Sequence, residues 1–160
     1  MNKTFREFLD EKARESPAGE RRRRRDEWIN AVDRLLGQIE VWLREADPDA
    51  RLEFEHLTEK RLESGIGEYE VSSLRIRLGD AQIDVKPVAR NVMGLVAPPG
   101  TVGEAIRAEG RVDISCRGWK YHLYRIIGEG EDQWYARGEK LGDRRLTSDL
   151  LLEIVQDLMS

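Results

Sequence analysis

Cysteine and histidine are scarce in this sequence, which has one cysteine and two histidines among 160 residues. Cys116 has no second thiol with which to form an internal disulfide, and His56 and His122 add too few ligands for the usual Cys/His zinc site. A chain of this length can bury enough apolar surface to fold without cross-links. We therefore expect no metal and no cofactor, and a reducing cytoplasm as the compartment.

Long hydrophobic runs are also absent. No apolar stretch approaches the roughly 20 residues that a membrane-spanning helix needs, and the first 16 residues are charged throughout. Charged residues make up 36% of the chain and apolar residues 39%, with a formal net charge of -4. We expect a single well-solvated domain over residues 1–160, without a secretory leader and without membrane contact.

The strongest pattern that is present is an amphipathic stripe over residues 28–43. Its apolar residues recur every three or four positions, as on one face of a helix, and polar residues fill the other face. Ser16-Pro17 suits a helix start and Asp47-Pro48 a helix end, which predicts a helix from Pro17 to about Glu45. The stripe consists of Trp28, Ile29, Val32, Leu35, Leu36, Ile39, Trp42 and Leu43.

A shorter helix is predicted before the long one. Thr4 and Glu7 fit a capping box, and a helix over residues 5–15 places Phe5, Phe8 and Leu9 on one side. The long helix has no apolar face before its stripe begins, so we interpret residues 1–27 as a projecting helical arm. This arm carries five consecutive arginines, Arg21, Arg22, Arg23, Arg24 and Arg25.

From residue 52 onward the apolar period changes from 3.6 to 2, which is typical of β-strands. We predict a bulge at Ser72-Ser73, a type II′ hairpin turn at Gly79-Asp80, a weaker turn at Arg117-Gly118, and a final helix capped by Thr147 or Ser148. The predicted strands include a deeply buried one over 88–97 and one over 106–116 whose even-numbered residues face inward.

The predicted fold class is α+β. Consecutive hairpins give a mainly antiparallel sheet of six or seven strands, packed on the long N-terminal amphipathic helix, with a short N-terminal helix and a C-terminal helix. This order of elements is similar to that of small acidic bacterial chaperones and adaptors, such as type III secretion chaperones. The similarity covers element order and no motif, so what it implies, a bacterial-type binding protein, is an analogy of fold.

The segment Ile83-Asp84-Val85-Lys86 resembles the strand half of the PD-(D/E)XK nuclease motif. The resemblance implies that Asp84 would bind Mg²⁺ and that Lys86 would act as the catalytic base or orient the attacking water. However, the preceding strand offers Arg75 and Arg77 where that family has its first aspartate. The hairpin register places Arg75 opposite Asp84, so we prefer a cross-strand ion pair and keep a metal-dependent nuclease as a remote alternative.

The next hairpin places Asp113 opposite His122 on the outer face, with Ser115 nearby. An Asp-His pair beside a serine resembles part of a catalytic triad, but Ser115 is in mid-strand and lacks the G-x-S-x-G context of an exposed nucleophile. We therefore favour a solvated polar face, and take Cys116 as a small core residue. A candidate surface for contact with a partner consists of Arg111, His122 and Tyr124.

The run from Arg21 to Arg25 is the most unusual feature. Such a run can hold the phosphates of a nucleic acid, yet acidic residues flank it and no base-stacking aromatic residues are interleaved with it. We therefore expect a non-enzymatic cytoplasmic protein-binding module, acting as a regulatory subunit, adaptor or chaperone-like component. Nucleic-acid binding through the same five arginines is the alternative, and the oligomeric state is left open.

Overall fold

Two helices begin the chain in the computed structural model, which describes residues 3–98 and 105–160. They are α1 (Phe5–Glu15) and α2 (Pro17–Glu45). The Thr4 hydroxyl accepts a hydrogen bond from the Glu7 backbone and the Glu7 carboxylate accepts one from the Thr4 backbone, which is the predicted capping box. Ser16 caps α2 by accepting a hydrogen bond of 3.0 Å from the Gly19 amide. The predicted bounds of both helices are confirmed.

The strands of the described residues form a seven-stranded sheet and a separate two-stranded ribbon, and every pairing is antiparallel. The order in the large sheet is β1-β2-β3-β6-β7-β8-β9, and β4 pairs with β5 in the ribbon. The strands are β1 (Glu53–Glu63), β2 (Gly67–Leu78), β3 (Ala81–Ala89), β4 (Leu95–Val96), β5 (Ile106–Arg107), β6 (Arg111–Cys116), β7 (Trp119–Gly128), β8 (Glu131–Arg137) and β9 (Arg144–Arg145). The predicted α+β class is confirmed.

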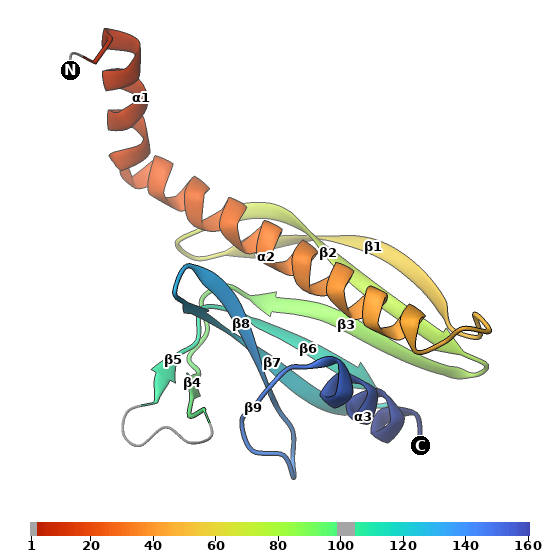
Figure 1. Ribbon diagram of the computed structural model, residues 1–160. Coiled ribbons are helices and arrows are strands. Elements are labelled where there is room, and N and C mark those ends of the chain that lie inside the picture. The colour runs from red at the N-terminus through yellow and green to blue at the C-terminus, as the bar shows by residue number, and fades with distance from the viewer. Residues whose placement is uncertain (1–2, 99–104) are drawn as a thin grey trace.

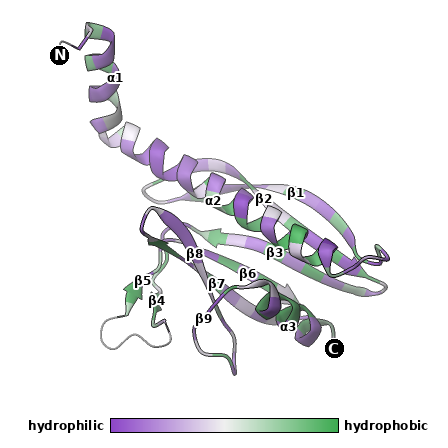
Figure 2. Ribbon diagram, in the orientation of Figure 1, coloured by the Kyte–Doolittle hydropathy of each residue, from purple (hydrophilic) through white to green (hydrophobic). Residues whose placement is uncertain are grey.

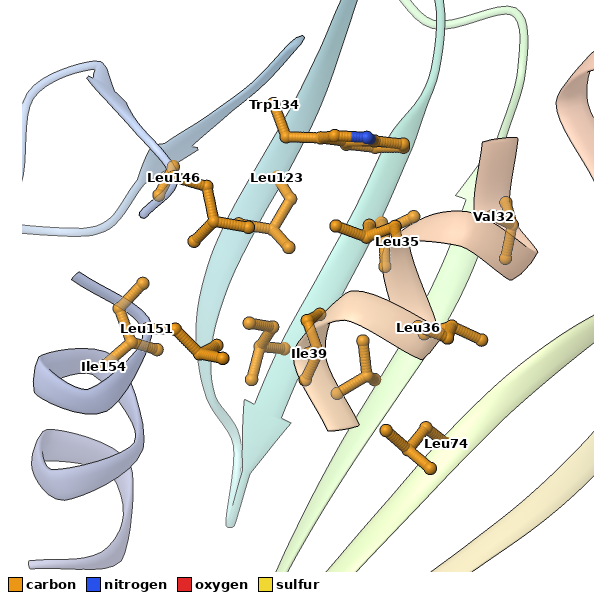
Figure 3. Close-up of a cluster of buried hydrophobic side chains, with 14 of the residues drawn as sticks. Val32, Leu35, Leu36, Ile39, Leu74, Leu123, Trp134, Leu146, Leu151 and Ile154 are labelled. Carbon is orange, nitrogen blue, oxygen red and sulfur yellow. The ribbon is translucent and has the colours of Figure 1, made fainter. Parts of the chain in front are cut away.

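α2 and the C-terminal helix α3 (Ser148–Met159) cover the same face of this sheet (Figure 1). Figure 3 shows Leu35 and Ile39 of α2 and Leu151 and Ile154 of α3 meeting above the strands. Trp28 and Ile39 are fully buried, and burial of each such large apolar side chain contributes about 1.5–3 kcal/mol. The predicted stripe is therefore the surface that fixes α2 on the sheet.

Before Trp28, the helices leave the sheet. Figure 1 shows α1 standing clear of the strands and the first turns of α2 connecting it to the rest of the molecule. Figure 2 shows that this part is mostly hydrophilic. We call residues 3–27 the arm and residues 28–160 the body. Within the described part of the chain, no helix combines the length and apolar content needed to cross a bilayer.

The strand predicted over 88–97 is wrong, and the strand predicted over 106–116 is confirmed only over Arg111–Cys116, where Val112, Ile114 and Cys116 face the core. β3 ends at Ala89, and the chain then forms the short β4, which pairs with β5 in a separate ribbon. This ribbon lies over the second face of the sheet, where it buries a small cluster of apolar side chains. The apolar pattern could not predict this ribbon. It indicates which residues avoid water, but it does not indicate on which face of the sheet they are buried. The cluster consists of Val96, Ala108, Tyr124, Ile126 and Tyr135.

The predicted bulge at Ser72-Ser73 is also wrong. β1 and β2 pair residue by residue along their whole length without a register shift. Tyr69 and Val71 nevertheless belong to the main core, although their parity differs from that of the inward Leu74. β2 pairs with β3 only over Leu74–Leu78, so the rest of the β1-β2 pair is a two-stranded ribbon. Such ribbons twist strongly, and the twist turns Tyr69 toward the core without an extra residue.

The predicted hairpin turns are confirmed, and they fix the register that matters for the site. Gly79 has a φ of +58° and begins a two-residue loop between β2 and β3. That loop sets Arg75 opposite Asp84. At the β6-β7 hairpin, Arg117 and Gly118 both have positive φ values, as in a type I′ turn, and this turn sets Asp113 opposite His122.

Candidate functional site

Asp84 and Lys86 lie in a network of paired charges on the second face of the sheet. The Arg75 Nε donates to Asp84 Oδ1 at 2.9 Å, and Gln82 donates to the other oxygen at 3.2 Å. The hydrogen bond that Arg75 makes to Asp84 raises the pKa of Arg75. Lys86 Nζ lies 3.6 Å from a carboxylate oxygen of Glu59. The predicted cross-strand ion pair is thus confirmed, and both candidate catalytic groups have structural partners.

Asp113 and His122 also pair as the register predicted. His122 Nδ1 lies 2.7 Å from Asp113 Oδ1, and Arg111 Nε donates to the same oxygen at 3.1 Å. In the described chain, Ser115 makes no hydrogen bond with His122, and no group of three or more His, Cys, Asp or Glu side chains is placed to hold a metal ion. Cys116 is buried in the main core. Arg111, Asp113 and His122 therefore form an ion-paired cluster. Its carboxylate is buried, in contrast to the solvated face expected from the sequence, and its two cationic partners are partly exposed.

Tyr124, the third residue of the predicted contact surface, is covered. Its ring is packed in the cluster beneath the β4-β5 ribbon, and the Arg137 guanidinium lies 4.7 Å from the ring centroid. Asp143 holds Arg137 by two hydrogen bonds of 2.6 and 2.9 Å, and this pairing keeps the pKa of Asp143 below its usual range. Arg111 and His122 retain partly exposed side chains, so partner contact at this face stays a prediction for those two residues.

The five arginines lie on the arm, and they precede Trp28, the first residue of α2 that packs on the sheet. Arg23 forms an ion pair with Glu20, and Arg24 Nε lies 3.9 Å from the same carboxylate. Arg25 Nε lies 3.9 Å from Asp26. Among the described residues, Arg21 and Arg22 have no carboxylate partner, and both side chains are exposed. The run therefore presents positive charge that the protein itself neutralises only in part.

α1 carries an exposed apolar face. Phe5, Phe8 and Leu9 are 73%, 45% and 49% exposed, and the rings of Phe5 and Phe8 stack with centroids 6.3 Å apart. Lys12 Nζ lies 5.9 Å from the Phe8 ring centroid. The sequence pattern placed these three residues on one side of a helix without indicating a role for them. The structure leaves that side uncovered by the described part of the chain.

A hollow of about 290 Å³ lies where the arm meets the body. It is lined by Arg24 of α2, by residues 90–92 after β3, and by residues 107–109 at β5. Three arginines, Arg24, Arg90 and Arg107, contribute to its wall, and Glu109 is the acidic residue among the lining side chains. We call it the arginine pocket. The sequence pattern indicated only Arg24, because no local signal connects residues that lie 66 or more positions away along the chain.

The carboxylate of Glu63 fixes the segment that carries Arg90. It accepts hydrogen bonds from the Arg90 amide at 3.2 Å and the Asn91 amide at 2.6 Å, and from the Tyr69 hydroxyl at 2.8 Å. Burial is the main reason why the pKa of Tyr69 is raised, and the hydrogen bond to the Glu63 carboxylate raises it further. Arg107 is placed by the β4-β5 pairing. The segments that carry Arg90 and Arg107 are thus each held by hydrogen bonds, the first to Glu63 and the second by strand pairing.

A larger groove, of about 790 Å³, runs along α2 on the side of β8. It extends from Glu27, at the base of the arm, to Trp42, and Trp134 and Ile127 add apolar surface from the strands. The buried Arg125 is paired, since its Nε donates to Asp132 at 2.8 Å, and the exposed Arg34 donates to the other oxygen at 2.6 Å. The groove therefore offers apolar contact area, and Arg34 and Arg125 in its wall are both paired with Asp132.

In comparisons with known proteins, no family model, no curated protein and no solved structure matches this chain.

Proposed function

We propose that this protein is a cytoplasmic, non-enzymatic binding module that engages another protein through its N-terminal arm. The observation that carries the proposal is the exposed face of Phe5, Phe8 and Leu9 on α1. The two stacked phenylalanine rings lie on a helix that stands clear of the sheet (Figure 1), so they lack the stabilisation that burial normally gives to such side chains. Contiguous exposed apolar surface of this kind marks contact sites for other proteins.

The local sequence supports this proposal because it forms the helix before any partner arrives. The Thr4 capping box begins α1, and Ser16 with Pro17 begins α2 directly afterward. A helix that is already formed presents its apolar face in the binding geometry, so less conformational entropy is lost on association. The expected mode is an amphipathic helix that lies in a groove of the partner.

The charge of the arm indicates what kind of groove the partner would have. Residues 3–27 contain nine basic and seven acidic residues, whereas residues 28–160 contain 18 basic and 24 acidic ones. The arm is thus positive and the body negative. A partner groove with an apolar floor and acidic margins would match the arm, and the opposite charge of the margins would speed the encounter and fix its orientation.

The absence of an enzymatic role is part of the proposal. Its support is that Asp84 and Lys86 each have an ion-pair partner, and that the hydrogen bonds of Asp113 to Arg111 and His122 serve the sheet. A regulatory subunit, an adaptor or a chaperone-like component all fit this mode of action.

The test is partner capture that depends on the arm. A Phe5→Ser/Phe8→Ser double variant removes the stacked rings, and a Leu62→Ser/Trp119→Ser double variant is the matched control, because both of its residues are exposed on the body. We expect a protein captured from the native lysate, and then reconstituted in purified form, to bind the control and not the arm variant. Equal capture by the two variants would refute the arm as the binding surface. If light scattering shows that the unmodified protein is a dimer and that the arm variant is a monomer, the partner of the arm is a second copy of this chain and not a different protein.

A second candidate function is nucleic-acid binding through Arg21 to Arg25, favoured by the exposed and unpaired state of Arg21 and Arg22 within the described chain. Binding of this kind weakens steeply with salt, because each phosphate contact releases counterions. Fluorescence anisotropy with labelled DNA and RNA tests it at several salt concentrations. No binding at low salt by the unmodified protein would eliminate this candidate, and loss on replacing the five arginines by alanine would support it.

A further inference from the structure

The arginine pocket is lined by three arginines from elements that are distant in the sequence. We propose that it binds the phosphate group of a phosphorylated side chain on the partner protein, an inference that rests on the proposed function. The juxtaposition of Arg24, Arg90 and Arg107 around one hollow carries it. No such site follows from the arginine run alone, because Arg90 and Arg107 belong to the body.

The charge of the pocket suits a dianion. Three arginines and Glu109 give a net charge of about two positive units, and a phosphomonoester carries about −1.5 to −2 at neutral pH. Three like charges on residues that line one hollow repel one another when no anion is bound. Glu109 relieves this only in part, since its nearest oxygen lies 4.0 Å from Arg90 Nη2. A bound phosphate would neutralise the remainder.

The pocket also retains hydrogen-bond donors. Arg90 Nη1 donates to Asn91 at 3.0 Å, but Arg90 Nε is buried without a hydrogen-bond partner. Arg24 has one distant carboxylate, and Arg107 has no ion pair or side-chain hydrogen bond with any described residue. Guanidinium groups bind phosphate with two parallel N–H donors. Three of them around one hollow can surround a tetrahedral anion from several sides.

The size and the surroundings of the pocket favour a phosphate carried by a protein. About 290 Å³ with a mostly polar wall holds the phosphate group, so the rest of the ligand lies outside. Among the described residues, no aromatic side chain lines the pocket, whereas single-stranded nucleic acids are usually held by stacking of bases on such rings. Val92 lines it and Met93, the next residue, is fully exposed, which provides apolar contact for the neighbours of a phosphorylated residue.

The experiment uses the full chain and a peptide of alanines with one central phosphoserine, compared with the same peptide carrying serine. Titration is followed by NMR of the arginine Nε–H signals. We expect the Arg90 and Arg107 signals to shift with the phosphopeptide alone. Arg107→Gln and Arg24→Gln each should weaken binding about tenfold or more, because each removes a charge-assisted contact. Arg51→Gln is the matched control, since it removes the same charge at the other end of α2, where Arg51 is exposed.

Three outcomes would overturn the proposal. Equal response to both peptides, or equal weakening by Arg107→Gln and Arg51→Gln, would mean that the pocket has no specific phosphate site. Tighter binding of inorganic phosphate than of the phosphopeptide would assign the pocket to a free anion. Tighter binding of a 5′-phosphorylated single-stranded oligonucleotide, lost in Arg107→Gln, would assign it to nucleic acid. The peptide titration needs no partner protein, so its failure is distinguishable from failure of the capture experiment.

Discussion

α2 runs without a break from Pro17 to Glu45, but only its second half packs on the sheet. From Trp28 onward, seven of its side chains are buried, and tertiary packing keeps this half helical. Before Trp28 no side chain of α2 is fully buried. That half depends on its Ser16 cap, on Pro17 and on the ion pairs of Arg23 and Arg24 with Glu20.

This difference teaches how to interpret the arginines. Positive side chains near a helix N-terminus oppose the macrodipole, and exposed ion pairs at helical spacing contribute only a few tenths of a kcal/mol each. Helix stability therefore does not explain five consecutive arginines in the half that has least support. A role outside the folded body, such as contact with a partner, explains them better. The comparison predicts that changes in the body alter stability and that changes in the arm alter binding.

The largest effect is expected for Trp28→Ala, at the boundary between the two halves. Trp28 is fully buried and its ring lies 6.2 Å from that of Trp134, centroid to centroid. Removal of a buried tryptophan side chain should lower the free energy of unfolding by about 3–5 kcal/mol, as measured by urea denaturation. A loss below about 1 kcal/mol would mean that the stripe does not hold α2 on the sheet.

A smaller loss is expected for Gly110→Ala. Gly110 has a φ of +146°, and an added Cβ would lie 2.2 Å from Cζ3 of the buried Trp28 ring. The ring must move, which should cost about 2–3 kcal/mol in the free energy of unfolding. Gly37→Ala is the control, because Gly37 lies in α2 with nothing within 4 Å of the new methyl group. It should stabilise the protein by about 0.5–1 kcal/mol through helix propensity, and a loss there would contradict the placement of Gly37.

Tyr121→Phe should have a modest effect that depends on pH. Tyr121 donates to Asp157 at 2.6 Å, linking β7 to α3, and this hydrogen bond raises the pKa of Tyr121 to about 12. An unfolded tyrosine titrates near 10, so the contribution is complete below about pH 10 and is lost as the pH rises toward 12. At pH 8 the variant should lose about 0.5–1 kcal/mol, because the bond is accessible to solvent. A deficit in urea denaturation that does not shrink between pH 8 and pH 11.5 would contradict this.

The smallest effect on stability is expected for Leu9→Ala in the arm. Leu9 is 49% exposed and packs on no part of the body that the structure describes. Its truncation should change the free energy of unfolding by less than about 0.5 kcal/mol, whereas the same substitution at the buried Leu36 should cost about 2–5 kcal/mol. Similar losses at the two positions, measured by urea denaturation, would remove the distinction between arm and body.

Signals within a few residues determined both N-terminal helices and the hairpins. The Thr4 capping box, Ser16 with Pro17, and the stripe from Trp28 act within one or two helical turns, so the sequence alone specified where α1 and α2 begin and which face of α2 is buried. Gly79 specified a two-residue turn, and the turn specified that Arg75 faces Asp84. The pairing of charges on this face therefore followed from local turn chemistry.

Only the tertiary structure decided which surfaces cover one another. An alternation of period two shows which side chains share a face of a strand, but Tyr124 became buried because the β4-β5 ribbon folded over that face. Arg90 and Arg107 joined Arg24 because Glu63 holds one segment and strand pairing holds the other. Contacts of this range depend on the closure of the whole chain around its core, and no local pattern of residues contains that information.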